Sequence, residues 1–183
     1  SVKLRRLQTG KEGLNMEALR GRNVKIFDGE LRRRQRANRE YLMRLKSSNL
    51  LINFLLEAGR YPGRELPQDA HGGWESPVCQ LRGHFLGHWL SAAAMHYAAS
   101  NDHELKAKAD AIIDELAECQ KDNGGRWVGP IPEKYLDWIA RGKPVWAPQY
   151  TLHKVFMGLV DMYLYAGNTK ALEIADKIVV MDG

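Results

Sequence analysis

Cysteine is scarce in this chain. Its 183 residues include only Cys79 and Cys119, with neither a CxxC spacing nor a second pair. Zinc knuckles and disulfide-stapled scaffolds both need closely spaced or paired cysteines, so the sequence speaks against both classes. We expect the two residues to behave as small hydrophobic side chains in the interior.

Long apolar runs are absent as well. No stretch approaches the roughly eighteen consecutive apolar residues that a membrane-spanning helix requires. With 44% hydrophobic and 27% charged residues, the composition is that of an ordinary globular protein, and the length is enough for one domain with a real core. The sequence therefore predicts a globular domain without a membrane partner.

Acidic residues are outnumbered by basic ones, which gives a net charge of +5. The excess is concentrated in one short region that contains Arg32, Arg33, Arg34, Arg36 and Arg39. These arginines alternate in a helical pattern with apolar residues, namely Leu31, Ala37, Tyr41, Leu42 and Leu45. We interpret them as the solvent face of an amphipathic helix, and we expect no nucleic-acid partner.

Convincing pairs of alternating strands are also missing, and helical periodicity dominates after the first 27 residues. Helices are predicted at 29–46, 48–58, 76–99, 102–121, 132–141, 148–165 and 168–180. Glycines stand just past several of these segments, where helix C-caps are expected; they are Gly59, Gly124, Gly142 and Gly167. The fold class is therefore all-α, with residues 1–27 extended or irregular and residues 28–183 forming the helical domain.

The helical part resembles itself at an interval of 66 positions. Tyr97, Ala109, Asp110 and Ile112 match Tyr163, Ala175, Asp176 and Ile178. In both copies a long helix ends in a short turn, and a second helix follows behind an Asp or Asn cap. Repeated αα-hairpins of this kind predict a helical solenoid or a closed ring of hairpins.

Two histidines stand four residues apart in GHFLGHWLSAAAMHYA, within a predicted helix that Ser76 would cap and Pro77 would open. That spacing places His84 and His88 on one face of the helix. A zinc-protease pattern would need Glu directly after the first histidine, where this chain has Phe85. Histidines satisfied in a helix interface, or a polar pair lining a substrate pocket, remain the other two interpretations.

The connections between the predicted helices carry tryptophan together with glycine or proline. They read AHGGWE, NGGRWVGPIP and KPVWAPQY. Aromatic rings held on stiff loops at one end of a helical ring suit a sugar site, because an indole face covers the apolar C–H face of a sugar ring. Each tryptophan could instead plug the end of a barrel.

Four segments together resemble one known family. GGWES, GHFLGHWLSAAAMHYAASND, LAECQKDNGGRW and WAPQYTLHKVFMGLVDMYLYAGN, in this order and spacing, resemble the N-terminal part of the β-L-arabinofuranosidase-like glycoside hydrolases of families 127 and 146. The resemblance runs from about Phe27 to the C-terminus. It implies an (α/α)6 barrel with the active site at its open end, of which this chain would form about half.

The resemblance also implies an unusual chemistry. In this family a Cys thiolate bound to zinc is the nucleophile of a retaining hydrolysis, other cysteines and a Glu hold the metal, and a second Glu is the acid or base. Neither Cys79 nor Cys119 occupies the family's zinc context. We therefore expect zinc as the cofactor with no ligand in this chain, and no catalytic residue in it.

What the resemblance assigns to this chain is a wall of the carbohydrate pocket. The expected substrate-binding residues are His153, His88, His84, Trp74, Glu75, Trp146 and Tyr150. Trp74 and Glu75 are expected beside His88 at one end of the helices, because Gly72 and Gly73 allow a sharp turn there. The alternatives are a non-catalytic carbohydrate-binding or scaffold protein, and another (α/α)6 sugar hydrolase or lyase.

A half barrel would leave one flank uncovered. The residues expected there are Leu152, Val155, Phe156, Leu159, Met162, Ile174, Ile178 and Val179. Exposed apolar patches of that size drive association. The sequence thus predicts self-association through the C-terminal helices.

Overall fold

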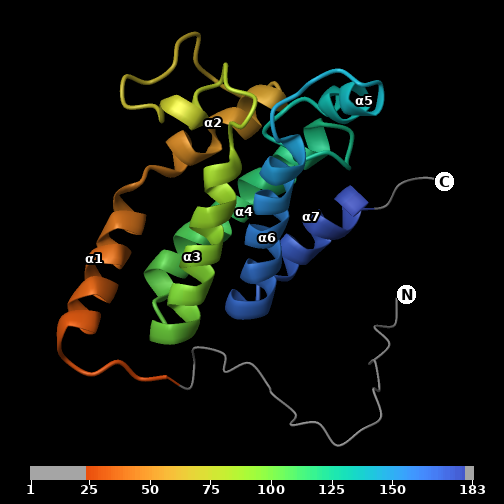
Figure 1. The fold of residues 1–183 in the computed structure, drawn as a ribbon. Helices are drawn as coiled ribbons and strands as arrows, with labels where there is room; N and C mark the ends of the chain where they lie inside the picture. Colours follow the sequence, from red (N-terminus) through yellow and green to blue (C-terminus); the bar gives the residue numbers. More distant parts are fainter. Residues whose placement is uncertain (1–23, 180–183) are drawn as a thin grey trace, which may run out of the picture.

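The computed structural model describes residues 24–179, apart from the side chain of Val179, and these residues contain helices but no strand. Figure 1 shows the order α1 (Glu30–Arg44), α2 (Ser47–Glu57), the 3₁₀ helix η2 (Gly73–Glu75), α3 (His84–Ser100), α4 (His103–Asp122), α5 (Lys134–Ala140), α6 (Pro148–Ala166) and α7 (Thr169–Val179). The all-α prediction is confirmed. Residues 24–27 are irregular, as expected, whereas 1–23 lie outside the described residues.

Two αα-hairpins, α3–α4 and α6–α7, pack side by side as part of an α/α barrel (Figure 1). The predicted repeat appears in their turns, because Asp102 and Asn168, 66 positions apart, cap α4 and α7. The Asp102 carboxylate accepts a hydrogen bond from the Leu105 N–H at 3.1 Å, and the Asn168 amide oxygen accepts one from the Ala171 N–H at 2.9 Å. Each hairpin thus closes through the same local interaction.

The core lies where α3, α4, α6 and α7 meet. Its fully buried large side chains include Leu86, Trp89, Leu90, Leu105, Ile112, Ile113, Leu116, Leu159, Met162 and Ile174. Each such side chain stabilises the fold by roughly 1.5–3 kcal/mol through burial. The sequence predicted an uncovered apolar flank on the C-terminal helices. This prediction is wrong for Val155, Leu159, Met162 and Ile174, which are buried, because α6 packs on α3 and α7 packs on α6 and α4.

α3 and α6 approach each other closely through two glycines. A Cβ atom added to Gly87 would lie 1.9 Å from the carbonyl oxygen of Lys154, and one added to Gly158 would lie 2.7 Å from the carbonyl oxygen of Gly87. Real Cβ atoms do not come that near to backbone atoms. The glycines therefore set the distance between the two neighbouring helices.

The predicted helix 76–99 begins eight residues too early. Residues 76–83 form a series of turns, and α3 starts at His84 after Gly83, whose φ of 80° lies in the left-handed region. Ser76 caps no helix in the structure. The physical reason is that the α3 N-terminus is satisfied by another side chain, Glu75, described below.

α1 forms where a helix was predicted, but the apolar face expected for it is only partly covered. Leu42 is buried, whereas Leu31 is 72% and Tyr41 44% exposed. Lys108 of α4 donates hydrogen bonds to the carbonyl groups of Leu42, Met43 and Leu45. These hydrogen bonds hold the C-terminal end of α1 against α4. Among the described helices, none is long and apolar enough to cross a membrane.

Candidate functional site

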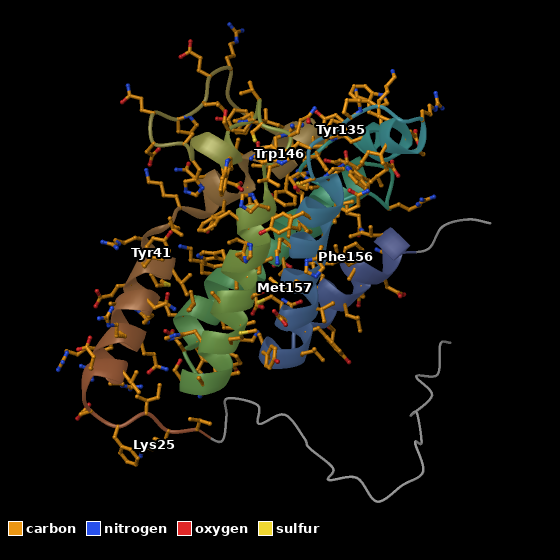
Figure 2. The ribbon with its side chains drawn as sticks, in the orientation of Figure 1. Lys25, Tyr41, Tyr135, Trp146, Phe156 and Met157 are labelled. Carbon is orange, nitrogen blue, oxygen red and sulfur yellow. The ribbon has the colours of Figure 1, made fainter. Side chains whose placement is uncertain are left out.

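Six of the seven expected site residues meet at the end of the bundle where α3 and α6 begin. We call them the α3 N-terminal cluster; they are Trp74 and Glu75 of η2, His84 and His88 of α3, Trp146 in the loop before α6, and Tyr150 of α6. Figure 2 shows Trp146 at that end of the helices. Segments up to 76 residues apart in the sequence thus build one surface.

Ring contacts connect the members of the cluster. The Trp74 ring centroid lies 6.4 Å from that of His84 and 6.4 Å from that of Trp146. The His84 ring in turn lies 6.0 Å from the ring of His88 and 5.9 Å from that of Tyr150. The expectation that Trp74 and Glu75 lie at this end of the helices is confirmed, although the Ser76 cap proposed for it does not form.

Glu75 caps α3 from outside the helix. Its Oε2 accepts a hydrogen bond from the Gly83 N–H at 2.8 Å, and its Oε1 accepts one from the Phe85 N–H at 3.1 Å. Oε1 also lies 2.7 Å from His84 Nδ1. A carboxylate at this position is favoured by the unpaired N–H groups and by the helix dipole.

The loop that carries Glu75 is held by two buried amides of α2. Asn53 Nδ2 donates to the carbonyl oxygen of Glu75 at 2.9 Å, and Asn49 Nδ2 donates to that of Asp69 at 2.8 Å. Sequence reasoning missed both residues. The available signal was the pair of asparagines four residues apart inside the otherwise apolar stretch NLLINFLL, since a buried amide needs a hydrogen-bond partner.

The two cluster histidines differ in environment. His84 Nδ1 faces the Glu75 carboxylate and the Leu81 carbonyl oxygen at 3.1 Å, both of which are acceptors, so Nδ1 carries a proton. Burial and the nearby positive charge of Lys154 lower the pKa of His88, which keeps its imidazole neutral near pH 7. His88 Nε2 lies 3.4 Å from the Tyr150 hydroxyl.

The tryptophans of the three linkers divide into two kinds. Trp127 is 7% exposed and donates from Nε1 to the Ile131 carbonyl oxygen, as expected of a plug. Trp74 and Trp146 are 64% and 51% exposed, and their rings meet edge to face. The second pair thus presents open aromatic surface, which is what stacking against a sugar requires.

Trp146 is fixed through its backbone. Its N–H donates to Gln80 Oε1 at 2.7 Å, and the next residue, Ala147, has a φ of 50° just before Pro148 opens α6. A non-glycine residue in the left-handed region is strained and persists where surrounding contacts impose it. The conformation of this loop therefore presents the ring of Trp146 above α3 and α6.

His153 is the expected residue that lies outside the α3 N-terminal cluster. It is exposed on α6, and it contributes least to the lowered pKa of His88, after burial, Lys154 and His84. Its neighbour Lys154, which sequence reasoning missed, places Nζ 5.0 Å from the centroid of the Tyr150 ring. At helical spacing of four from Tyr150, this lysine could have been anticipated.

The described residues do not fit a zinc site. They hold no group of three or more His, Cys, Asp or Glu side chains that could bind a metal ion. Burial raises the pKa of the Cys119 thiol to about 11, so this thiol stays protonated at neutral pH. The described part of the chain therefore offers no thiolate with companion ligands.

Residues 23–180 match a protein-family model described as "Beta-L-arabinofuranosidase, GH127 catalytic domain". The match covers all of the described helices and the whole α3 N-terminal cluster. No curated protein matches the chain.

Proposed function

Since the chain belongs to the family of the GH127 β-L-arabinofuranosidase catalytic domain, we propose that it forms part of a glycoside hydrolase that acts on L-arabinofuranosides. The α3 N-terminal cluster is the sugar-binding surface in this proposal. The observation that carries it is the pair of exposed indole rings, Trp74 and Trp146, in contact with each other beside His84.

Each group of the cluster has a role in holding the sugar. The indole faces cover the C–H face of the furanose ring. His84 Nε2 accepts a hydrogen bond from a sugar hydroxyl, because the Glu75 carboxylate keeps the proton on Nδ1. Neutral His88 and the Tyr150 hydroxyl both donate and accept, which suits the alternating hydroxyl groups of a glycan.

We further propose that the groups that break the glycosidic bond lie outside this chain. A retaining hydrolase of the common kind uses two carboxyl groups on opposite sides of the bond. Glu75 is the only carboxylate of the cluster, and it already accepts hydrogen bonds from Gly83, Phe85 and His84. The zinc and cysteine nucleophile implied by the family would likewise be supplied from elsewhere.

Hydrolysis of aryl β-L-arabinofuranosides by the complete gene product, with zinc supplied, tests the proposal. We expect turnover by the complete product and none by residues 1–183 alone. Absence of turnover on a panel of aryl glycosides would instead favour a non-catalytic carbohydrate-binding role. Turnover by residues 1–183 would show that the bond-breaking groups lie within them.

A matched pair of tryptophan variants tests the site itself. Trp146→Ala should weaken sugar binding by up to about tenfold, since an aromatic contact contributes roughly 0.5–1.5 kcal/mol. Trp138→Ala is the control, because Trp138 of α5 lies between Lys134 and Lys143, away from the cluster contacts. Equal effects of the two variants in a titration of tryptophan fluorescence would argue against the cluster.

We also propose that the chain self-associates through α6 and α7. The exposed apolar side chains there are Val160, Tyr163, Leu164 and Leu172, each 38–40% exposed. They differ from the residues expected from the sequence, but they lie on the same two helices. Size-exclusion chromatography with light scattering should show a species larger than the monomer, and Leu164→Glu should shift it to the monomer; a monomeric wild-type chain would contradict this proposal.

A further inference from the structure

A second polar hollow lies at the other end of α3, away from the cluster. It has a volume of about 270 Å³ and is lined by Arg32, Gln35, Arg36 and Arg39 of α1 together with His96, Ser100 and Asp102. Along a helix with 1.5 Å rise, His96 and His84 are separated by about 18 Å. The hollow is therefore a separate site from the proposed sugar-binding surface.

The four α1 residues share one helix face by their spacing. Positions 32, 35, 36 and 39 recur at intervals of three and four, which aligns their side chains along the hollow. The other two arginines in the arginine-rich stretch of α1, Arg33 and Arg34, both form ion pairs with Glu30. α1 thus carries two arginines that are paired with a carboxylate, Arg33 and Arg34, and three others that line the hollow, Arg32, Arg36 and Arg39.

The cavity set has more positive than negative charge. Asp102 is the one carboxylate among the lining residues, and it is already bonded to Arg39 and caps the Leu105 N–H. Arg39 is bonded to Glu104 as well. Asp102 and Glu104 are therefore both engaged by Arg39, and among the described residues neither forms an ion pair with Arg32 or Arg36.

Arg32 and Arg36 have weak compensation. Arg32 donates to the neutral Gln35 Oε1 at 2.7 Å, which leaves the guanidinium charge unneutralised. Arg36 lies 4.0 Å from Asp28, whose side chain is 98% exposed, and such a pair is largely screened by water. An adjoining hollow of about 380 Å³ shares Arg32, Gln35 and Ser100 and adds another cation, Lys25.

We propose that this hollow between α1 and α3 binds a phosphate or sulfate group, which Arg32 and Arg36 contact with their guanidinium N–H groups. The amide of Gln35 supports the site, since its oxygen accepts from Arg32 and its nitrogen remains a donor. Arginine suits tetrahedral oxyanions because its planar fork offers paired N–H donors. The volume, just below that of usual ligand pockets of about 300 Å³ or more, fits a small anionic group rather than a long ligand.

Calorimetric titration of residues 1–183 with inorganic phosphate and with sulfate, at constant ionic strength set by sodium chloride, tests the proposal. Binding should be saturable, and Arg32→Gln with Arg36→Gln together should weaken it by at least about tenfold, since a hydrogen bond to a charged group contributes that much. Arg39 stays unchanged in this design because it joins α1 to Asp102 and Glu104.

The matched control comes from the same helix. Arg33→Gln with Arg34→Gln removes the same charge from the Glu30 side, and it should leave the affinity within about twofold. Equal weakening by both double variants would show a diffuse charge effect and overturn the proposal, as would the absence of saturable binding to the wild-type chain. Circular dichroism of each variant separates lost binding from lost folding.

Two further ligands identify the source of the anionic group. A hexose 6-phosphate and a sulfated monosaccharide present the same tetrahedral group on a sugar. Tighter binding of either than of the free anion would assign the site to a modified glycan, and tighter binding of the free anion would assign it to inorganic phosphate or sulfate. Both results support the site, whereas acetate binding as tightly as phosphate would contradict the tetrahedral preference.

Discussion

Gly87 and Gly158 touch backbone to backbone where α3 crosses α6. A Cβ on Gly158 would come within 2.9 Å of the Gly87 Cα, and a Cβ on Gly87 would meet the Lys154 carbonyl group. Because His88 follows Gly87 and Tyr150 lies one turn before Lys154, the approach of α3 to α6 also sets the distance between the two sides of the sugar-binding surface.

Gly87→Ala is therefore expected to destabilise the chain by about 1–3 kcal/mol through overpacking. Urea unfolding followed by circular dichroism gives the free energy of unfolding. Gly72→Ala is the control, because its φ of −96° suits any residue and nothing lies within 4 Å of the added methyl group. Similar losses in the two variants would mean that the crossing tolerates a side chain.

Glu75→Gln should reduce both stability and sugar binding. The substitution keeps the shape of the side chain but replaces one acceptor oxygen with an NH2 group, so the N–H of Gly83 or of Phe85 loses its partner. We expect a loss of about 1–2 kcal/mol in the free energy of unfolding. Glu65 is exposed, so Glu65→Gln serves as the control and should change the free energy of unfolding by less than about 0.5 kcal/mol. If Glu75→Gln left the free energy of unfolding unchanged, the capping role of Glu75 would be ruled out.

His96 should make stability depend on pH below about 7. Burial, together with Arg39 and Arg32, lowers its pKa in the folded chain, while Asp102 opposes this shift. A lowered imidazole pKa means that the unfolded chain binds the proton more tightly, so this stability is fully present above the unfolded pKa of about 6.5 and is lost as the pH falls through it toward the folded pKa.

The comparison of wild type with His96→Gln checks this dependence. The decline in the free energy of unfolding from pH 7.5 to 5.5 should become shallower in the variant, although His88, whose pKa is lowered too, keeps part of it. His103→Gln removes an exposed imidazole and serves as the control. A variant whose pH dependence matches that of the wild type would exclude His96 as a source.

The two cysteines should react at very different rates. Cys119 is buried with a thiol pKa of about 11, whereas Cys79 is half-buried in the turns before α3. Iodoacetamide at neutral pH should label Cys79 first in the folded chain, and both residues should react alike in guanidinium chloride, because the thiolate is the reacting form. Mass spectrometry of tryptic peptides reads the result, and rapid labelling of native Cys119 would contradict the burial.

Local signals in the sequence were sufficient for the hairpins. Asp102 and Asn168 cap the helices that follow them, and the αL residues Asn101 and Gly167 end the helices before them. These interactions join residues at most five positions apart. The periodicity, the repeat and the all-α class follow from such contacts, so they are contained in the sequence itself.

The sequence predicted which residues form the site, but it did not predict how they are arranged in space. The family resemblance selected six residues that the structure brings together, whereas the local capping signal of Ser76 and Pro77 placed the start of α3 too early. The structure places a carboxylate from another segment there instead. Position along the chain does not show which distant group will satisfy a helix terminus.

The sequence by itself determined the helical segments and the caps of α4 and α7, since each depends on backbone geometry within a few residues. Tertiary structure alone decided which sides of α6 are covered, how Asn53 holds Glu75, and that Tyr150 meets His88 across 62 positions. Those outcomes depend on packing between helices. The periodicity of a helix indicates which of its faces is buried, but it does not show which other helix covers that face.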